Sequence, residues 1–131
     1  MKLELKEDEL EYFHELTPAE LIEILKAGAE RMAEAWKIGA QSHRGKTGSM
    51  QANIRPGEYH VDIDSASVAV YPQGADPRGV SNAAKAFIIN YGYGGRRTKK
   101  TGDKWVNKAE AAAEESAHAL MMEKYEEILR R

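Results

Sequence analysis

The sequence contains no cysteine, and it has no long run of apolar residues. Without cysteine there is no disulfide framework, no thiolate nucleophile and no thiolate metal ligand. No segment reaches the roughly 18 consecutive apolar residues that a membrane-spanning helix needs. The first residues alternate leucine with charge, so they lack the roughly 7–15-residue apolar run of a signal peptide. We therefore expect a protein that works in a reducing compartment and contacts no membrane.

The chain does have the composition of one ordinary folded domain. It has 131 residues, of which 42% are hydrophobic and 31% are charged. A chain of this length buries a core large enough to fold without disulfides or metals. We expect a single domain over residues 1–131, of the α+β class. In it a long amphipathic helix and a C-terminal helix pack on a mainly antiparallel sheet of about four strands.

Capping patterns and apolar spacing predict the two helices. Thr17 followed by Pro18 and Glu20 is a helix start with a capping box, so we expect a long helix over 18–43. Asn107 and Glu110 repeat the capping spacing before a second helix over 107–129. The expected core residues of the two helices are Leu21, Leu25, Met32, Trp36 and Leu120.

Short apolar runs separated by turn residues predict the sheet. We expect strands at 50–55, 59–63, 67–71 and 84–91, so that the sheet occupies residues 50–91. Residues 1–7 are expected to form an arm or an edge strand, and residues 8–16 to contain a short helical stretch. The connection at 72–83 is long for a hairpin, which favours a functional loop.

Charge is distributed unevenly, and residues 92–104 are the basic segment. Residues 1–16 have net charge −4, residues 96–108 have +5, and residues 109–131 have −3. Four glycines and five bases in 92–104 predict a basic flexible loop that contacts a neighbouring subunit or DNA. The candidate contact residues are Tyr91, Tyr93, Arg96, Arg97, Lys99 and Lys100.

Three patterns resemble catalytic or metal-binding motifs but lack necessary parts. The Gly45-Lys46-Thr47 segment lacks the glycine that a P-loop has four residues before it. A P-loop also precedes the helix that it opens, whereas this segment follows a helix. The Glu-x-x-His spacings at 11–14 and 115–118 match half of a di-iron bundle, which needs two more carboxylate-bearing helices. His60 stands near Asp62 and Asp64, but sequence neighbours rarely form a triad. We expect no catalysis, no metal and no cofactor.

The order of elements then shows a family resemblance over nearly the whole chain. The long helix is followed by Thr47-Gly48, Met50 and Ile54, and a later apolar run ends in Tyr91-Gly92. The chain thereby resembles the gene-product-ten-like family of tailed bacteriophages, whose members are neck or tail-completion proteins of the head–tail junction. It departs from the family at Ser49-Met50, where members often have Asn-Leu. It also departs at Asn90, where they often have an acid, and in the bases at 96–100.

The resemblance implies a structural and not an enzymatic role. Copies would form a ring, with six as the family-level copy number, that joins the tail to the filled capsid and leaves a channel for DNA. The implied partners are copies of itself, neighbouring neck and tail proteins, and DNA touched passively. The implied location is the virion, and the bacterial cytoplasm during assembly or when a prophage encodes the protein. The alternative hypothesis is a small nucleic-acid-binding accessory protein that uses the 96–100 segment. A metal protein built on the two Glu-x-x-His pairs is a third.

Overall fold

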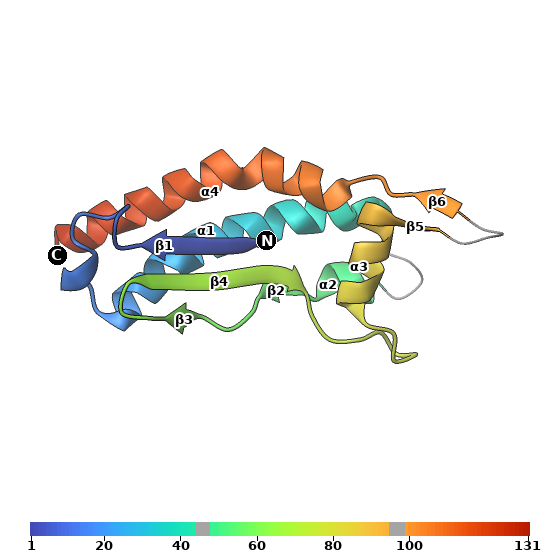
Figure 1. Cartoon of the computed structure of the whole chain (residues 1–131), viewed down its shortest axis with the longest axis horizontal. Coiled ribbons are helices and arrows are strands. Elements are labelled where there is room, and N and C mark those ends of the chain that lie inside the picture. The colour runs from blue at the N-terminus through green and yellow to red at the C-terminus, as the bar shows by residue number, and fades with distance from the viewer. Residues whose placement is uncertain (44–47, 95–98) are drawn as a thin grey trace.

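The computed structural model describes residues 1–43, 48–94 and 99–131, with the side chains of all these except 93, 94 and 99–101. Figure 1 shows an elongated molecule in which two long helices run along a sheet. The elements in chain order are β1 (Lys2–Lys6), η1 (Phe13–Glu15), α1 (Pro18–Gly39), η2 (Ala40–His43), α2 (Ser49–Ala52), β2 (Ile54–Pro56), β3 (His60–Val61), β4 (Ser65–Pro72), α3 (Asn82–Tyr91), β5 (Gly92–Gly94), β6 (Lys99–Thr101) and α4 (Trp105–Leu129). The predicted α+β class, with α1 and α4 packed on a four-stranded antiparallel sheet, is confirmed.

Strand β4 is the centre of the sheet. β1 pairs with it on one side, while β2 and β3 pair with it on the other, all antiparallel. Alternate β4 residues from Ala66 to Pro72 are buried, and the residues between them face away from the core. Because side chains alternate across a strand, one face of the sheet packs on helix α1 and the opposite face is left to solvent.

Helix α1 lies between the sheet and α4. Its start is fixed as predicted: the Thr17 hydroxyl accepts from the Glu20 N–H at 3.2 Å, and the Glu20 carboxylate accepts from the Thr17 N–H at 2.9 Å. Small residues let α4 approach closely, since a Cβ on Gly28 would lie 2.7 Å from the Met121 side chain. Trp36 of α1 meets Trp105 of α4 edge to face, with ring centroids 5.7 Å apart.

The core predictions hold on α1 and fail at one position on α4. Leu21, Leu25, Met32 and Trp36 are all buried, whereas Leu120 is 39% exposed. The buried positions of α4 follow a four-residue spacing, Trp105, Ala109, Ala113, Ala117 and Met121. The prediction placed the stripe one residue too early at this point, because Leu120 and Met121 are adjacent apolar residues and the four-residue spacing from Ala113 and Ala117 selects Met121.

The predicted strand at 84–91 is wrong, because these residues belong to helix α3. The Ser81 hydroxyl accepts from the Ala84 N–H at 3.2 Å, which caps the helix, and alanines at its start favour helix over strand. The predicted strand at 50–55 is also wrong in its first half, where Ser49–Ala52 is a helical turn before β2. The predicted sheet over 50–91 therefore ends at Pro72, and its fourth strand is β1.

Other boundaries shift by smaller amounts. The α-helix predicted over 18–43 ends at Gly39 and continues to His43 as a 3₁₀ turn, and the C-terminal helix begins at Trp105, two residues earlier than predicted. The 8–16 stretch contains only the 3₁₀ turn Phe13–Glu15, and the strand predicted at 59–63 is reduced to His60–Val61. Within the described ranges, no helix is long and apolar enough to span a bilayer.

Candidate subunit interface

Helix α3 presents an apolar side to solvent. Ala83, Phe87 and Tyr91 are spaced four residues apart, so they lie along one side of the helix. Phe87 is 62% exposed and Tyr91 is 52% exposed, and their ring centroids lie 4.8 Å apart. Two exposed aromatic rings in contact form a surface patch of the kind that partners cover.

Two buried asparagines hold α3 in place. At its end, the Asn90 amide donates to the Asn107 side chain at 2.8 Å, and its carbonyl oxygen accepts from the Val106 N–H at 2.8 Å. At its start, the Asn82 amide donates to the Gln73 carbonyl at 2.9 Å. Because both asparagine side chains are buried, these bonds hold the Asn82–Asn90 side of α3 against the end of β4 and the start of α4, and they leave Phe87 and Tyr91 exposed.

The apolar side of α3 borders a recess of about 240 Å³. Elements α1, β4, α3 and α4 all contribute to it. Its walls are Met1, Trp36, Tyr71, Pro72, Ala83, Ala86, Phe87, Asn90, Tyr91, Val106 and Glu110. The recess is smaller than the roughly 300–1,000 Å³ of most small-molecule sites, so its size favours one inserted side chain over a cofactor.

A cation borders this recess. The Lys104 ammonium lies 4.4 Å from the centre of the Tyr91 ring, a cation–π contact. Strands β5 and β6 continue from the end of α3, pairing Gly92 with Thr101. Acids are also near: Glu110 belongs to the wall, and Asp103 lies 2.7 Å from the His43 ring nitrogen. The five bases of 92–104 outnumber the one acid of that segment.

The loop before α3, expected to be a functional segment, is organised around a buried carboxylate. Asp76 is 5% exposed and pairs with Lys85 and Arg78. Its carboxylate also accepts from the N–H groups of Arg78 at 2.9 Å and Val80 at 3.0 Å. Hydrogen bonding from Lys85, followed by that from the Val80 N–H, holds the pKa of Asp76 far below its ordinary value of 3.8.

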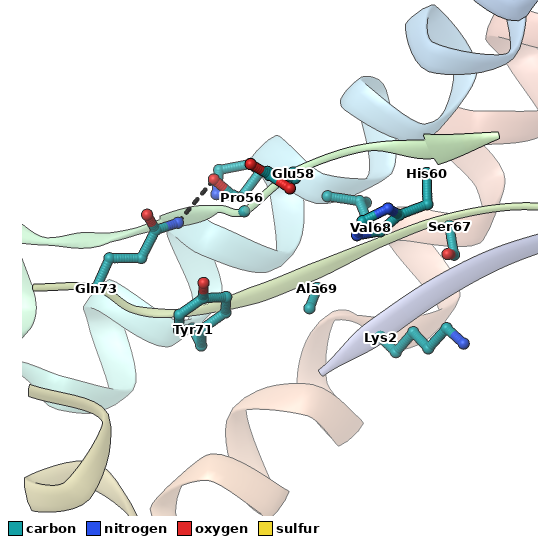
Figure 2. Close-up of a pocket in the computed structure, with 10 residues that line it drawn as sticks. Lys2, Pro56, Glu58, His60, Ser67, Val68, Ala69, Tyr71 and Gln73 are labelled. Atoms are coloured by element: carbon teal, nitrogen blue, oxygen red, sulfur yellow. Dashed lines mark hydrogen bonds between the residues drawn. The ribbon is translucent and has the colours of Figure 1, made fainter.

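A second hollow, of about 570 Å³, lies on the solvent face of the sheet (Figure 2). His60 and Ser67 are paired in register on β3 and β4 and lie beside each other there. Among the described residues, no hydrogen bond links these two side chains and none orients the His60 ring. The Gln73 side-chain amide donates to the backbone carbonyls of Arg55 and Pro56, at 3.0 and 2.8 Å. Among the residues that the structure describes, the hollow therefore shows no hydrogen-bonded nucleophile–base pair.

The structure describes the side chain of only one of the six predicted contact residues. Tyr91 lies on the recess. Tyr93, Lys99 and Lys100 belong to β5 and β6, with side chains outside the described part, and Arg96 and Arg97 lie outside the described residues. The sequence prediction did not include Phe87 and Tyr71, which line the recess, or Lys104, which lies over the Tyr91 ring. The four-residue spacing of Phe87 and Tyr91 is the signal that a helical assignment of 82–91 would have used.

The Glu-x-x-His pairs do not converge. His14 lies 2.6 Å from the Glu7 carboxylate, not against Glu11. In the part of the chain that the structure describes, no three His, Asp or Glu side chains are grouped as metal ligands.

Comparison with known proteins gives no match: no protein-family model, no curated protein and no solved structure matches the chain.

Proposed function

We propose that the protein is a structural component of the head–tail junction of a tailed bacteriophage, where copies assemble head to tail into a ring that joins tail to capsid. The proposal starts from the sequence resemblance at Thr47-Gly48 through Ile54 and at Tyr91-Gly92. In this role the chain binds copies of itself and neighbouring neck and tail proteins, and it performs no chemistry.

The separation of charge along the molecule is the observation that carries the proposal. The turn after β1 and the end of α4 lie together at one end of the long axis (Figure 1). The Tyr12 N–H donates to the Tyr125 hydroxyl at 3.1 Å, so the two segments are joined. Arg131, after the end of α4, also lies 3.0 Å from Glu23 of α1. This end is acidic, whereas β5 and β6, in the basic segment, lie at the opposite end.

A molecule with unlike ends has a physical reason to associate head to tail. Each exposed ion pair contributes only about 0–1 kcal/mol, so several must act together. At physiological ionic strength charges are screened beyond roughly 8 Å, so the attraction requires near contact and weakens with added salt. A head-to-tail contact repeated by rotation closes a ring, whereas a symmetric contact stops at a dimer.

A joining assay tests the role directly. Filled heads and free tails, prepared from cells of the encoding phage that lack this chain, would be mixed with the purified protein and counted by electron microscopy. We expect joined particles with the parent protein. A variant with Arg96, Arg97, Lys99 and Lys100 changed to Gln is expected to join far fewer.

The matched control changes Lys26, Lys37, Lys108 and Arg130 to Gln, which removes the same charge from exposed positions on α1 and α4. It should join particles as the parent does. Heads and tails that join equally well without the chain would overturn the proposed role.

The exposed rings of Phe87 and Tyr91 beside Lys104 also favour a second candidate, a nucleic-acid-binding accessory protein. Bases stack on exposed aromatic rings while cations follow the backbone phosphates. This function predicts that single-stranded DNA binds to the purified protein, that the affinity falls steeply with salt, and that Tyr91→Ala weakens it. Equal retention of parent and Tyr91→Ala would exclude stacking on this ring.

A further inference from the structure

The turn between β3 and β4 exposes an isoleucine between two aspartates. Ile63 is 87% exposed, the largest fraction among the exposed large apolar side chains described. Asp62 and Asp64 are also exposed, and neither carboxylate pairs with a base in the described part of the chain. The turn is firmly built, since the Asp62 N–H donates to the Ser65 carbonyl at 2.7 Å and the Glu7 N–H donates to the Asp64 carbonyl at 2.9 Å.

The recess beside α3 has the complementary character. Its walls include the rings of Trp36, Tyr71 and Phe87, and it has room for one aliphatic side chain. The carboxylate in the wall, Glu110, lies 3.4 Å from the Met1 ammonium, which balances its charge. Lys104, over the Tyr91 ring, places a cation at the same surface. The isoleucine side chain fits an apolar recess of this size, and the flanking carboxylates are opposite in charge to the cation beside the recess.

We propose that Ile63 of one copy inserts into the α3 recess of the next copy. The proposal rests on the self-assembly part of the proposed function and names its contact. The Ile63 turn and the recess lie at opposite ends of β4, so a chain cannot insert its own Ile63. The occupant is therefore Ile63 of a second copy. Ile63 lies just before the start of β4, while Tyr71 and Pro72, the last two residues of β4, line the recess. Eight strand residues separate the two sites by roughly 26 Å.

This spacing also fixes one distance in a closed ring. When the Ile63 turn of each copy coincides with the recess of the next, successive contact points around the ring are separated by the same ~26 Å. The contact uses two different surfaces, so it is heterologous and propagates around a ring or along a filament. The single apolar side chain acts as the anchor, and the surrounding charges orient it.

Sedimentation velocity at low salt, over a concentration series, tests the contact with two variants. Ile63→Gln removes the inserted side chain, and Ala83→Glu places a carboxylate at the recess from an exposed helical position. We expect each to weaken self-association at least about tenfold, as loss of an interface anchor does. Both sites are exposed, so melting temperatures should stay at the parent value.

Matched controls separate these effects from changes in general surface character. Ile38→Gln removes another exposed isoleucine, on α1, and Ala84→Glu places the same carboxylate on α3 at an exposed position outside the recess. Both should associate like the parent.

Mixing the two variants distinguishes a heterologous contact from a symmetric one. The Ile63→Gln copy keeps its recess and the Ala83→Glu copy keeps its isoleucine, so an equimolar mixture forms one intact contact per pair. We expect dimers in the mixture, no larger species, and far fewer dimers in either variant alone at the same concentration. Loss of association in both variants without rescue on mixing would overturn the contact proposed here.

A cross-linking experiment gives an independent measurement. Because the chain has no cysteine, Asp64→Cys and Ala83→Cys can be introduced together without side reactions. A disulfide requires Cα atoms within about 7 Å, so the two cannot pair within one chain, because position 64 lies before β4 and position 83 lies in α3, beyond the far end of that strand. Oxidation should yield a ladder of linked copies, and exclusive monomer would contradict the contact.

The outcomes separate this contact from the wider role. Suppose that Ile63→Gln and Ala83→Glu both associate like the parent, while the variant with the four bases of 96–100 changed to Gln does not. The Ile63 contact is then wrong, and self-assembly through the basic segment stands. If the parent remains monomeric over the whole series, the contact is wrong, and the joining assay still decides the role at the head–tail junction.

Discussion

Trp36 is the single side chain whose removal should test the packing most directly. It is 4% exposed, contacts Trp105 edge to face, and forms part of the recess wall. Truncating a buried tryptophan to alanine costs about 3–5 kcal/mol. Two features favour the lower part of that range. The new cavity joins the existing recess, where water can enter, and the Trp36 indole N–H has no hydrogen-bond partner among the described residues.

We therefore expect Trp36→Ala to lower the free energy of unfolding by about 3 kcal/mol. This is a large share of the roughly 5–15 kcal/mol that stabilises a domain. Trp36→Phe retains most of the apolar contact and removes an unpartnered N–H, whose burial costs about 1–3 kcal/mol. We expect it to cost no more than about 1.5 kcal/mol.

Urea unfolding followed by far-UV circular dichroism measures both changes without relying on tryptophan fluorescence. Ile38→Ala is the control, because Ile38 lies two residues later on α1 and is 63% exposed. It should change stability by no more than about 0.5 kcal/mol. If Trp36→Ala lies within about 1 kcal/mol of the parent, or destabilises no more than Ile38→Ala, Trp36 is not packed between α1 and α4 as described.

Two further predictions concern the segments on either side of α3. Gly102→Ala should destabilise the protein, because the new Cβ would clash with the Asn90 carbonyl oxygen, a backbone atom that cannot rotate away; an unchanged melting temperature would contradict the close approach. Asp76→Asn should destabilise the protein at pH 7, since it loses the pairs with Lys85 and Arg78. The pKa of Asp76 is lowered on folding, so its contribution is complete above about pH 4 and is lost as the pH falls further. The melting-temperature gap between parent and Asp76→Asn should therefore close in acid, and a gap independent of pH would exclude a charge effect.

The elements that sequence predicted well are those whose local signals agree with their packing. The capping box at Thr17 and Glu20 is formed as predicted, and the apolar stripe behind it does face the core. In β1, Leu3 and Leu5 alternate with charge, and both are buried against the core. In these segments local propensity and tertiary contacts favour the same structure, so pattern alone is sufficient.

Helix α3 shows where the pattern is ambiguous. Phe87, Ile88 and Ile89 are adjacent and apolar, which resembles a buried strand when taken alone. The structure instead exposes Phe87 and Ile88 and buries Ala86 and Asn90. A short run of this kind satisfies both periodicities, and the signals that favour the helix lie outside the run, in the Ser81 cap and the alanines that follow it. The hydrogen bond from buried Asn90 to Asn107 joins residues 17 apart in sequence, which no local pattern reveals.

The same limit applies to the proposed contact, because its two halves lie in segments that look ordinary on their own. Ile63 is one apolar residue in a turn, and single exposed apolar residues are common. Tyr71 is one aromatic residue at the end of a strand. They become related only when β4 is seen as a single extended strand with the turn at its start and the recess at its end. A paired strand is nearly inextensible, so β4 holds the two surfaces at a fixed separation of roughly 26 Å. The repeat distance of the assembly is then set by strand length, and lengthening β4 and its partners by two residues each should enlarge the repeat by about 7 Å while preserving which face of the sheet is buried.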